Sequence, residues 1–279
     1  MRFTRSTTLL ALAAVIAACA DNATLTAPPA AAGAPSAIYN GYPATSSTFA
    51  SVGALMYDFN ADGVINGDDE DCTGSLISPT VFLTAAHCVE FLPSNAQLYV
   101  SFAPDLYAKG ITVIKATGFT FDPGYGHDNA DLHDMAVVFL PAKATKGMAT
   151  FNLPTAGYLD ALSAKGALAS AQFYNVGYGT GNTATGVPGF PYDGTKKYSV
   201  SEFSALEPNW LQLLMNTNAT GGGGDCYGDS GGPKMLVSDP TTIVATVTTG
   251  DYVCRATTKD YRLDTPSARA FLGQFVTLR

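Results

Sequence analysis

Short runs of β-prone hydrophobic residues recur along the chain, separated by glycine, proline, asparagine and aspartate. Such runs between turn residues are typical of strands, and their regular spacing predicts an all-β sandwich or barrel. The predicted strands lie at residues 52–57, 98–102, 111–117, 135–140, 172–178, 211–216, 235–237 and 243–248.

The pattern becomes helical only near the end of the chain. Thr265 is a good N-cap residue, and Pro266 suits the first helical position. Hydrophobic residues then recur at helical spacing, at Phe271, Leu272, Phe275 and Val276. We therefore expect one C-terminal α-helix after the strands.

Residues 1–18 have the features of a secretory signal peptide. Two arginines precede an apolar stretch at 9–18 that is too short to span a bilayer. The stretch ends in Ile-Ala-Ala-Cys, which resembles the bacterial lipobox, so Cys19 is the expected lipidation site. Ordinary cleavage nearby is the alternative, because small residues also flank Cys19. Residues 19–37 are rich in Ala, Pro, Thr, Ser and Gly and are expected to form a flexible tether or propeptide.

Composition narrows the classes of protein. Hydrophobic residues make up 47% of the 279-residue chain and charged residues 14%, which excludes a disordered chain. No apolar run in the sequence is long enough for a membrane-spanning helix, so we expect membrane contact only through a lipid anchor. The net charge of −8 and the lack of a basic block argue against nucleic-acid binding.

Five cysteines are an odd number for an exported protein. If Cys19 carries a lipid, four cysteines remain, which is enough for two disulfides in an oxidising compartment. These four are Cys72, Cys88, Cys226 and Cys254.

Three motifs carry residues suited to nucleophilic catalysis. His87 lies in Leu-Thr-Ala-Ala-His-Cys, Asp134 directly precedes an apolar run, and Ser230 lies in Gly-Asp-Ser-Gly-Gly-Pro. A serine hydroxyl needs an adjacent base to take its proton, and that base needs an anion to orient its imidazole. Taken singly, each motif has a structural interpretation: a core histidine, a turn aspartate or a loop. Their occurrence together favours a serine hydrolase.

The order of the three residues distinguishes the classes of serine hydrolase. No histidine follows Ser230, which excludes the Ser–Asp–His order of the α/β-hydrolases. The subtilisin order would need an acid before His87 and a fold that alternates strands with helices, which the pattern does not show. The remaining order is His, Asp, Ser. His127 and His133 have no assigned role, and no zinc-site spacing joins the histidines to the cysteines.

These motifs and their order strongly resemble those of the trypsin/chymotrypsin-like serine proteases. The resemblance covers residues 38–279 and implies two six-stranded antiparallel β-barrels with the active site in their cleft. The first barrel is expected at about residues 38–157 and the second at about 158–279. A non-catalytic binding protein of the same fold is the alternative to a protease.

The resemblance also implies a role for each motif residue. Ser230 attacks the scissile carbonyl, and His87 acts as general base and then as general acid. Asp134 is preferred over Asp131 as the residue that holds the imidazolium, because it directly precedes the apolar strand. The backbone N–H groups of Gly228 and Ser230 form the implied oxyanion hole. All three triad positions are filled, whereas non-catalytic relatives usually lose one.

The same resemblance implies the disulfides and the partners. Cys72 is expected to pair with Cys88 and pin the histidine loop, and Cys226 is expected to pair with Cys254 and frame the specificity pocket. Catalysis of this kind needs no cofactor. The implied partners are protein or peptide substrates and a proteinaceous inhibitor, and the implied state is a monomer.

Zymogen activation is suggested by the sequence Ile38-Tyr39-Asn40-Gly41. It resembles the new N-terminus that inserts on cleavage and pairs with the aspartate before the serine, here Asp229. A plain linker is the alternative. Ala37 precedes the segment, so a trypsin-like activator is not expected. No free cysteine remains to hold a cleaved propeptide, so this cleavage would release the protease from its lipid.

Five residues are candidates for the specificity pocket on the same grounds. Gly224 takes the position, six before the serine, that holds aspartate in trypsin-like members, and Asp225 places a carboxylate one residue later. Thr248 and Gly250 lie in the segment that lines one wall. Lys259 is expected at the back, where pairing with Asp225 would cancel the attraction for a basic side chain. Basic, apolar and broad preferences stay open.

An acidic insertion precedes Cys72 and resembles dockerin and EF-hand loops. Oxygen ligands occur at its positions 1, 3, 5, 9 and 12, with glycine at 6, as in a structural calcium loop. The loop departs from those families because a strand precedes it and position 12 is aspartate. An acidic turn between two strands is the alternative. The candidate ligands are Asp58, Asn60, Asp62, Val64, Asn66 and Asp69.

The sequence thus predicts a serine endopeptidase exported from a bacterial cell. We expect it to be lipid-anchored to the cell envelope and to be released extracellularly after processing.

Overall fold

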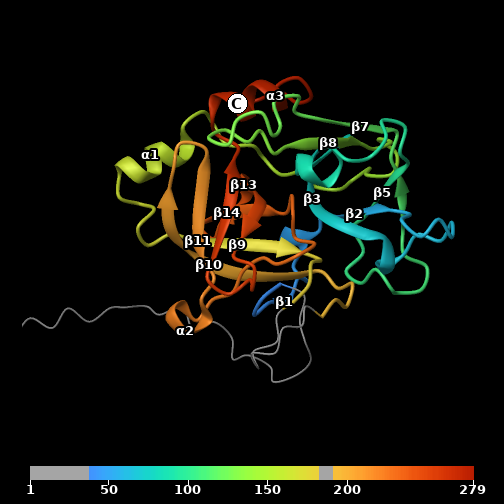
Figure 1. Ribbon diagram of the computed structural model, residues 1–279, viewed down its shortest axis with the longest axis horizontal. Coiled ribbons are helices and arrows are strands. Elements are labelled where there is room, and N and C mark those ends of the chain that lie inside the picture. The colour runs from blue at the N-terminus through green and yellow to red at the C-terminus, as the bar shows by residue number, and fades with distance from the viewer. Residues whose placement is uncertain (1–37, 182–190) are drawn as a thin grey trace, which may run out of the picture. The chain divides into compact units, whose positions relative to one another are not determined.

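The computed structural model describes residues 38–181 and 191–279. The predicted signal peptide (1–18), the tether (19–37) and the lipidation site Cys19 lie outside the described residues and stay predictions. Within the described ranges, no helix is both long and apolar enough to cross a membrane. Two antiparallel β-sheets form most of the structure, as the recurring short strands predict (Figure 1).

The first sheet closes into a barrel. Its strands follow the order β6-β5-β2-β3-β4-β8-β7, and the two edge strands β6 and β7 are consecutive in the chain. Ala116 N–H donates to Leu98 O at 2.9 Å, and the next N–H, of Thr117, donates to Phe139 O at 2.8 Å. The chain therefore passes from β5 to β8 as one bent strand, and the barrel has six strands when β6 and β7 are counted together. The strands are β2 (Val52–Tyr57), β3 (Glu70–Ser78), β4 (Val81–Thr84), β5 (Leu98–Ser101), β6 (Ile114–Lys115), β7 (Gly118–Phe121) and β8 (Ala136–Phe139).

The second sheet also closes on itself. Its order is β1-β10-β11-β14-β13-β12-β9, and β9 pairs with β10 as well, with Val200 opposite Tyr174. Strand β1 comes from the start of the described chain and joins β10, with Tyr42 opposite Tyr198. The strands are β1 (Tyr42–Pro43), β9 (Gln172–Gly177), β10 (Lys197–Leu206), β11 (Trp210–Leu214), β12 (Pro233–Leu236), β13 (Asp239–Gly250) and β14 (Thr257–Arg262).

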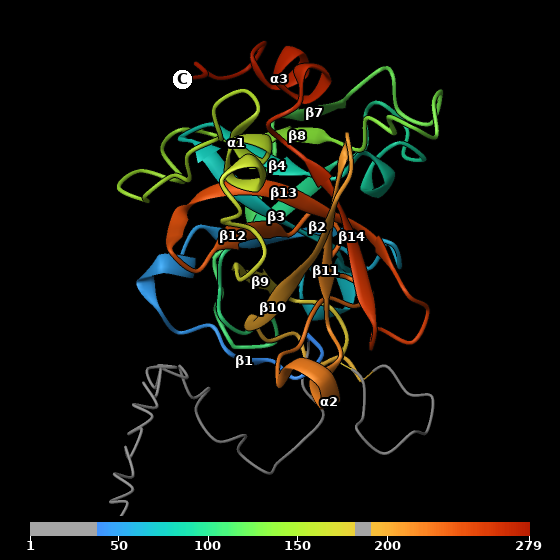
Figure 2. The ribbon, with the colours of Figure 1, turned by 90° about the vertical axis from the view of Figure 1, so that its left-hand side faces the viewer.

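The predicted C-terminal helix is α3 (Pro266–Leu272). Thr265 caps it, because its Oγ1 accepts the N–H of Ala268 at 3.3 Å. The helix ends before Phe275, which lies in the following turn and packs on Phe139 of β8 with 5.8 Å between ring centroids. Helix α3 follows the second barrel in the chain, lies above β7 and β8 at the top of Figure 2, and contributes to a buried cluster that both barrels share. The pattern does not predict α1 (Tyr158–Ala164) or α2 (Thr217–Thr220).

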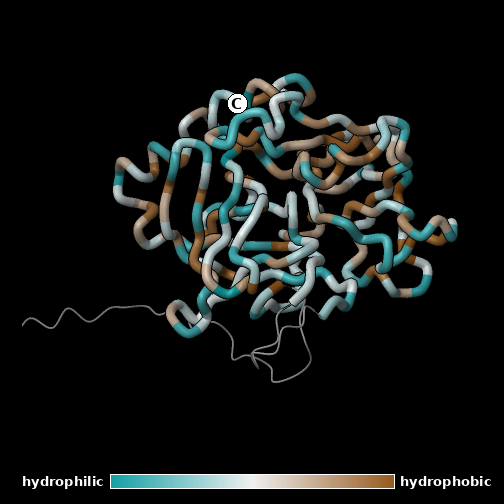
Figure 3. The backbone as a smooth tube through the Cα atoms, in the orientation of Figure 1, coloured by the Kyte–Doolittle hydropathy of each residue, from teal (hydrophilic) through white to brown (hydrophobic). Residues whose placement is uncertain are grey.

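Hydrophobic side chains hold the two barrels together. One buried cluster draws on both, with Leu83 and Val137 from the first barrel against Val176 and Met235 from the second. Burial of apolar surface contributes roughly 25 cal/mol per Å², so this shared core fixes the barrels in one arrangement. This packing also holds in place the loops of the two barrels that meet at their interface. Figure 3 shows hydrophobic and hydrophilic segments alternating along the chain, in the orientation of Figure 1.

Candidate active site

The pairing of β4 with β8 brings His87 and Asp134 together. Thr84, the last residue of β4, lies opposite Ala136, the first residue of β8. Residues shortly after β4 and shortly before β8 therefore lie at the same end of the barrel. His87 Nδ1 lies 2.9 Å from Asp134 Oδ2, and the His87 N–H donates to Asp134 Oδ1 at 3.0 Å. Through these two contacts the carboxylate holds both the ring and the backbone of the histidine turn. Asp134 is fully buried.

The environment of His87 favours the protonated ring. Burial lowers the pKa of His87, but the hydrogen bond to Asp134 and the charge of that carboxylate outweigh this effect. The charges of Asp71 and Glu90 act in the same direction, so the pKa lies above its usual value of 6.5. Burial also raises the pKa of Asp71 to about 6, while the charge of His87 opposes that rise. An imidazolium formed at His87 is therefore stabilised by its neighbours.

The Ser230 loop is shaped by glycines. Gly231 has a φ of +76°, which L side chains rarely adopt, and a Cβ there would collide with Thr84 Oγ1. Gly228 has a φ of +94°. Among the described residues, neither the Gly228 N–H nor the Ser230 N–H has a hydrogen-bond acceptor. Both groups are therefore available to a ligand.

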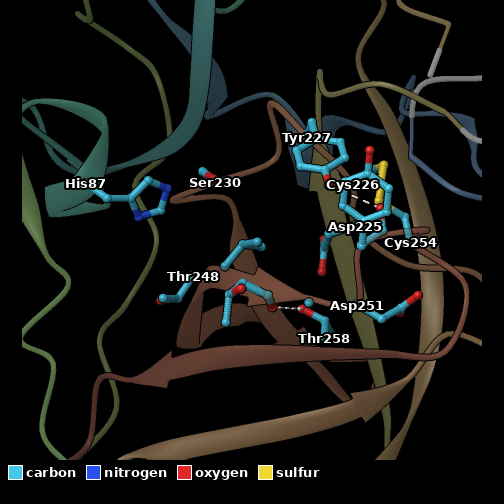
Figure 4. Close-up of a pocket in the computed structure, with 13 residues that line it drawn as sticks. His87, Asp225, Cys226, Tyr227, Ser230, Thr248, Asp251, Cys254 and Thr258 are labelled. Carbon is cyan, nitrogen blue, oxygen red and sulfur yellow. Dashed lines mark hydrogen bonds between the residues drawn. A yellow bond between two sulfur atoms is a disulfide. The ribbon is translucent and has the colours of Figure 1, made fainter. Parts of the chain in front are cut away.

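A residue of the first barrel holds this loop of the second. Thr73 on β3 donates its N–H to Ser230 O at 2.9 Å and its hydroxyl to Gly228 O at 3.0 Å. His87 and Ser230 face the same pocket, as Figure 4 shows. The structure thus brings together the three predicted catalytic residues, the first two from one barrel and the serine from the other.

Asp131 is occupied elsewhere. It accepts the hydroxyl hydrogen bond of Tyr261, and its Oδ2 lies 3.6 Å from His133 Nε2. His133 Nδ1 in turn lies 3.0 Å from Asp122. Asp134, and not Asp131, is therefore the aspartate in contact with His87.

Both disulfides implied by the resemblance are present. Cys72–Cys88 joins β3 to the histidine turn, and Cys226–Cys254 joins the serine loop to the segment after β13. Within the described ranges, the one cluster of His, Cys, Asp and Glu atoms close enough to hold a metal is Cys72, His87 and Cys88. Both of its cysteines are in a disulfide, so neither offers the thiolate that a metal binds.

The pocket beside Ser230 has a volume of about 470 Å³. Of the predicted pocket residues, Asp225, Thr248 and Gly250 line it. Gly224 does not line it, because the Met215 side chain occupies the space that a Cβ at Gly224 would take. Glycine is needed at this position for packing.

The prediction that Lys259 pairs with Asp225 is wrong. Lys259 lies 3.3 Å from Glu207 Oε2 and 4.8 Å from the Trp210 ring centroid. Side chains alternate along a strand, and its neighbours in β14, Thr258 and Asp260, are buried inside the barrel. Lys259 between them therefore points outward.

A different lysine, which the sequence interpretation missed, contacts Asp225. It is Lys234 of β12, whose ammonium pairs with Asp225 Oδ2. The sequence contains a signal for this role, because Lys234 is the one charged residue in the otherwise apolar segment Pro-Lys-Met-Leu of β12. That strand position is fully buried.

The segment that begins at Ile38 is packed beside the pocket. Ile38 is fully buried, and Tyr39 and Gly224 exchange backbone hydrogen bonds of 2.8 and 3.0 Å. Asp229 is also fully buried and accepts N–H groups from Gly179 and Cys226, at 2.9 and 2.8 Å. Burial, and next the charge of Asp225, raises the pKa of Asp229 well above its usual value.

Carboxylates of the acidic loop accept hydrogen bonds from the backbone of the same loop. Asp58 accepts the N–H groups of Asp62 and Gly63 at 3.2 and 3.1 Å. Asp69 accepts the N–H of Asn66 at 3.0 Å through Oδ2. Asp69 is only 1% exposed, and its Oδ1 has no hydrogen-bond partner among the described residues. The buried carboxylate therefore keeps an oxygen free for a further ligand.

Two antiparallel β-barrels, with a His–Asp pair and a serine facing one pocket, are the arrangement of a trypsin-like serine protease. The comparisons with known proteins point to the same class. A family profile described as Trypsin matches residues 52–271, and the chain belongs to this family. Its curated relatives include a trypsin-like protease of Streptomyces glaucescens, 29% identical over 60% of each chain. Brachyurin of Leptuca pugilator is 31% identical, over 58% of this chain and 69% of its own. The chain spans about three fifths of the length of the first curated relatives that it matches.

Solved structures agree on the fold. A mutant of human heparin binding protein (CAP37) has a TM-score of 0.62 and 16% identity, and covers 85% of this chain and 96% of its own. The HL collagenase structure has a TM-score of 0.59 and 19% identity, and covers 87% of this chain and 100% of its own. The predicted all-β, two-barrel fold is confirmed.

Proposed function

We propose that this chain is an exported serine endopeptidase that hydrolyses peptide bonds through an acyl-enzyme. One observation carries the proposal: the hydrogen-bonded pair of His87 and Asp134 faces the same pocket as Ser230. Membership of the trypsin family supports the reaction class. The two uncommitted N–H groups at Gly228 and Ser230 supply what a developing oxyanion needs.

The residues present account for each proton. Ser230 Oγ attacks the carbonyl carbon, and its proton passes to His87 Nε2. Asp134 stabilises the resulting imidazolium through Nδ1–H. His87 then gives the proton to the leaving amine, which departs and leaves an acyl-serine. Water attacks the ester with His87 again as base, and the proton returns to Ser230 Oγ as the carboxylic acid leaves.

Labelling with a fluorophosphonate probe tests this proposal. We expect processed wild-type protein to be labelled and the Ser230→Ala variant to remain unlabelled. Ser75→Ala, which alters a buried hydroxyl on β3, is the matched control and should be labelled like the wild type. Correctly processed and folded protein that takes no label would favour the alternative, a non-catalytic binding protein. Binding of a polyanion, such as the heparin named for the structural neighbour, is disfavoured by the net charge of −8.

We propose that cleavage before Ile38 activates the enzyme. Burial leaves the Asp229 carboxylate in need of a cation, and the segment that starts at Ile38 is packed beside the pocket. A new ammonium at Ile38 would satisfy that need and fix the serine loop. N-terminal sequencing of active enzyme should begin at Ile38. Active enzyme that begins at Cys19 would refute this activation step.

Export and lipidation are proposed on the sequence of residues 1–19 alone. The intact mass of the protein purified from the producing cell tests them together, because a diacylglyceryl group at Cys19 and removal of residues 1–18 each change the mass by a distinct amount. Cys19→Ser is the control, since it should remove the lipid mass and shift the protein from the membrane fraction to the soluble one. A wild-type form that begins at Cys19 and carries no lipid would end the anchor proposal.

We also propose that the loop from Asp58 to Asp69 binds Ca²⁺. The free, buried Asp69 Oδ1 fits the chemistry of a hard cation, and the charges of Asp58 and Asp62 raise the pKa of Asp69 further than burial alone. No three carboxylates of the described loop have oxygens within ligand distance of one another, so Ca²⁺ would have to draw them together on binding. Calcium should raise the melting temperature of the wild type. Asp62→Asn should weaken this response, and the control Asp105→Asn, outside the loop, should keep it. An unchanged melting temperature of metal-free protein after calcium addition would contradict the site.

A further inference from the structure

A buried polar network lies directly behind Asp225. Lys234 is fully buried, and its ammonium contacts Asp225 Oδ2, Asn175 Oδ1 at 2.6 Å and Asp260 Oδ1 at 3.6 Å. These partners come from three different segments of the second barrel: the serine loop, β9 and β14. The contacts to Asp225 and Asn175 are hydrogen bonds, and the contact to Asp260 is an ion pair beyond hydrogen-bond distance.

The network is fixed by further hydrogen bonds. The Asn175 amide donates to the hydroxyls of Ser199 and Ser201 at 2.9 and 2.8 Å, which orients its oxygen toward Lys234. Ser201 in turn donates to Gly223 O, at 2.6 Å, in the segment beside the pocket. Thr258 donates to Asp260 Oδ1 at 2.9 Å. Removal of the Lys234 ammonium would therefore leave Asp225 Oδ2 and Asn175 Oδ1 buried without this partner.

Charge at the bottom of the pocket is therefore balanced. Burial raises the pKa of Asp260 to about 8, although the charge of Lys234 opposes this rise. Asp260 thus holds a proton at neutral pH, and the positive Lys234 cancels the negative Asp225. Asp229 is the other carboxyl group that faces Asp225, and the raised pKa that burial gives it adds no charge before activation.

Asp225 still presents a free acceptor to the pocket. It lines the cavity on the side away from His87 in Figure 4. Its Oδ1 is buried and has no hydrogen-bond partner within the described chain. Among the other described groups that line the pocket, Asp251 carries one further carboxylate, which accepts three backbone N–H groups of its own loop and points away from Asp225 in Figure 4. At the Asp225 end, the pocket therefore offers one free hydrogen-bond acceptor whose charge is balanced by Lys234.

We propose that Lys234 determines primary specificity: it neutralises Asp225, so the pocket takes uncharged hydrogen-bond-donating side chains, of the glutamine and tyrosine type, in preference to arginine and lysine. This inference rests on the proposed peptidase function. A cationic side chain in the pocket would meet the charge of Lys234 as well as that of Asp225, whereas an amide or phenol donor needs only the free oxygen. Lys234 touches neither the substrate nor Ser230 and acts through Asp225.

Peptides that differ only in the residue before the cleaved bond test the inference. For wild-type enzyme, kcat/KM should be higher for glutamine and tyrosine than for arginine. Lys234→Met removes the cation and should raise the arginine-to-glutamine ratio of kcat/KM by about tenfold or more, because Asp225 is then unbalanced. Lys259→Met removes an equal charge on the outside of the same barrel and should change the ratio by less than about twofold.

A second variant tests whether the effect of Lys234→Met comes from misfolding. Lys234→Met combined with Asp260→Leu removes the cation and the carboxyl group that lies beside it, and should give the same gain for arginine. Benzamidine, an aromatic cation, should bind both Lys234 variants more tightly than the wild type by a similar factor. Strict cleavage after arginine or lysine by the wild type would overturn the inference, as would a ratio that changes no more in Lys234→Met than in Lys259→Met.

The fluorophosphonate reaction separates this inference from the proposed function. It reports Ser230 reactivity whatever side chain the pocket prefers. If wild-type protein is labelled but cleaves only after arginine or lysine, this inference is refuted and the proposed function stands. If correctly folded protein is not labelled, the proposed function itself is refuted.

Discussion

Replacing Thr73 with valine should loosen the serine loop from the opposite barrel. The Thr73 hydroxyl donates to Gly228 O at 3.0 Å and accepts the N–H of Tyr178 at 3.2 Å. Thr73 is fully buried. Valine keeps the shape of the side chain but leaves one carbonyl and one N–H without a partner, away from water.

The expected loss of stability follows from these two unpartnered groups. An unpartnered buried polar group costs about 1–3 kcal/mol, so we expect a loss of about 3 kcal/mol in the free energy of unfolding. For a domain of this size that corresponds to a fall of roughly 6–12 °C in Tm. A misplaced Gly228 N–H should also lower kcat by about tenfold, less than the full loss of an oxyanion donor.

Thermal unfolding should be followed in a Ser230→Ala background, which prevents self-digestion, and kcat in the active enzyme. Ser75→Ala is the matched control, since Ser75 lies on the same strand and its buried hydroxyl has no partner among the described residues. That variant should keep its Tm and kcat. If Thr73→Val is as stable and as active as Ser75→Ala, the hydroxyl does not hold the loop, and the reasoning is refuted.

Three further outcomes are expected. The acid limb of kcat/KM against pH should have its midpoint above 6.5, because the raised pKa of His87 keeps the base protonated to higher pH; a midpoint below 6.5 would contradict the structure. The pKa of Asp260 is raised from 3.8 to about 8, so the native state binds a proton that the unfolded state releases between these values, and stability falls as pH rises through this range. Urea unfolding at pH 5 and pH 8 should show the protein more stable at pH 5 by at least about 1.4 kcal/mol, and equal stability would argue against a buried neutral carboxyl. Replacing Cys72 and Cys88 together by serine should cost about 3 kcal/mol of unfolding free energy, and a loss below about 1 kcal/mol would show that the disulfide does not constrain the unfolded chain.

The hydrophobic pattern predicts several strands whose inner faces are apolar, although it misses the buried strand β4. The run at 52–57 coincides with β2, and the run at 172–178 contains β9. The run at 111–117 yields only the short β6, because the chain turns there from one neighbouring strand to another. Motif spacing predicts the residues at the pocket because His87, Asp134 and Ser230 each lie close in sequence to a strand end or a glycine turn.

Two of the strands that the pattern misses, β10 and β14, have polar inner faces. Strand β10 buries Ser199 and Ser201, and β14 buries Thr258 and Asp260, so neither shows a hydrophobic alternation. The same side chains surround Lys234, whose role is missed for the same reason. Only the closed barrel places these residues, distant in sequence, around one ammonium. A search for hydrophobic periodicity cannot detect a polar barrel interior.

Packing of α3 onto the first barrel has a consequence for the order of folding. Phe271 and Leu272 belong to the same buried cluster as Leu83 of β4. These residues leave the ribosome last, so the cluster shared by the two barrels cannot be completed until the whole polypeptide has been made. If the chain is exported and active as proposed, this delay would keep the polypeptide unfolded during passage and confine the folded, active form to the destination compartment.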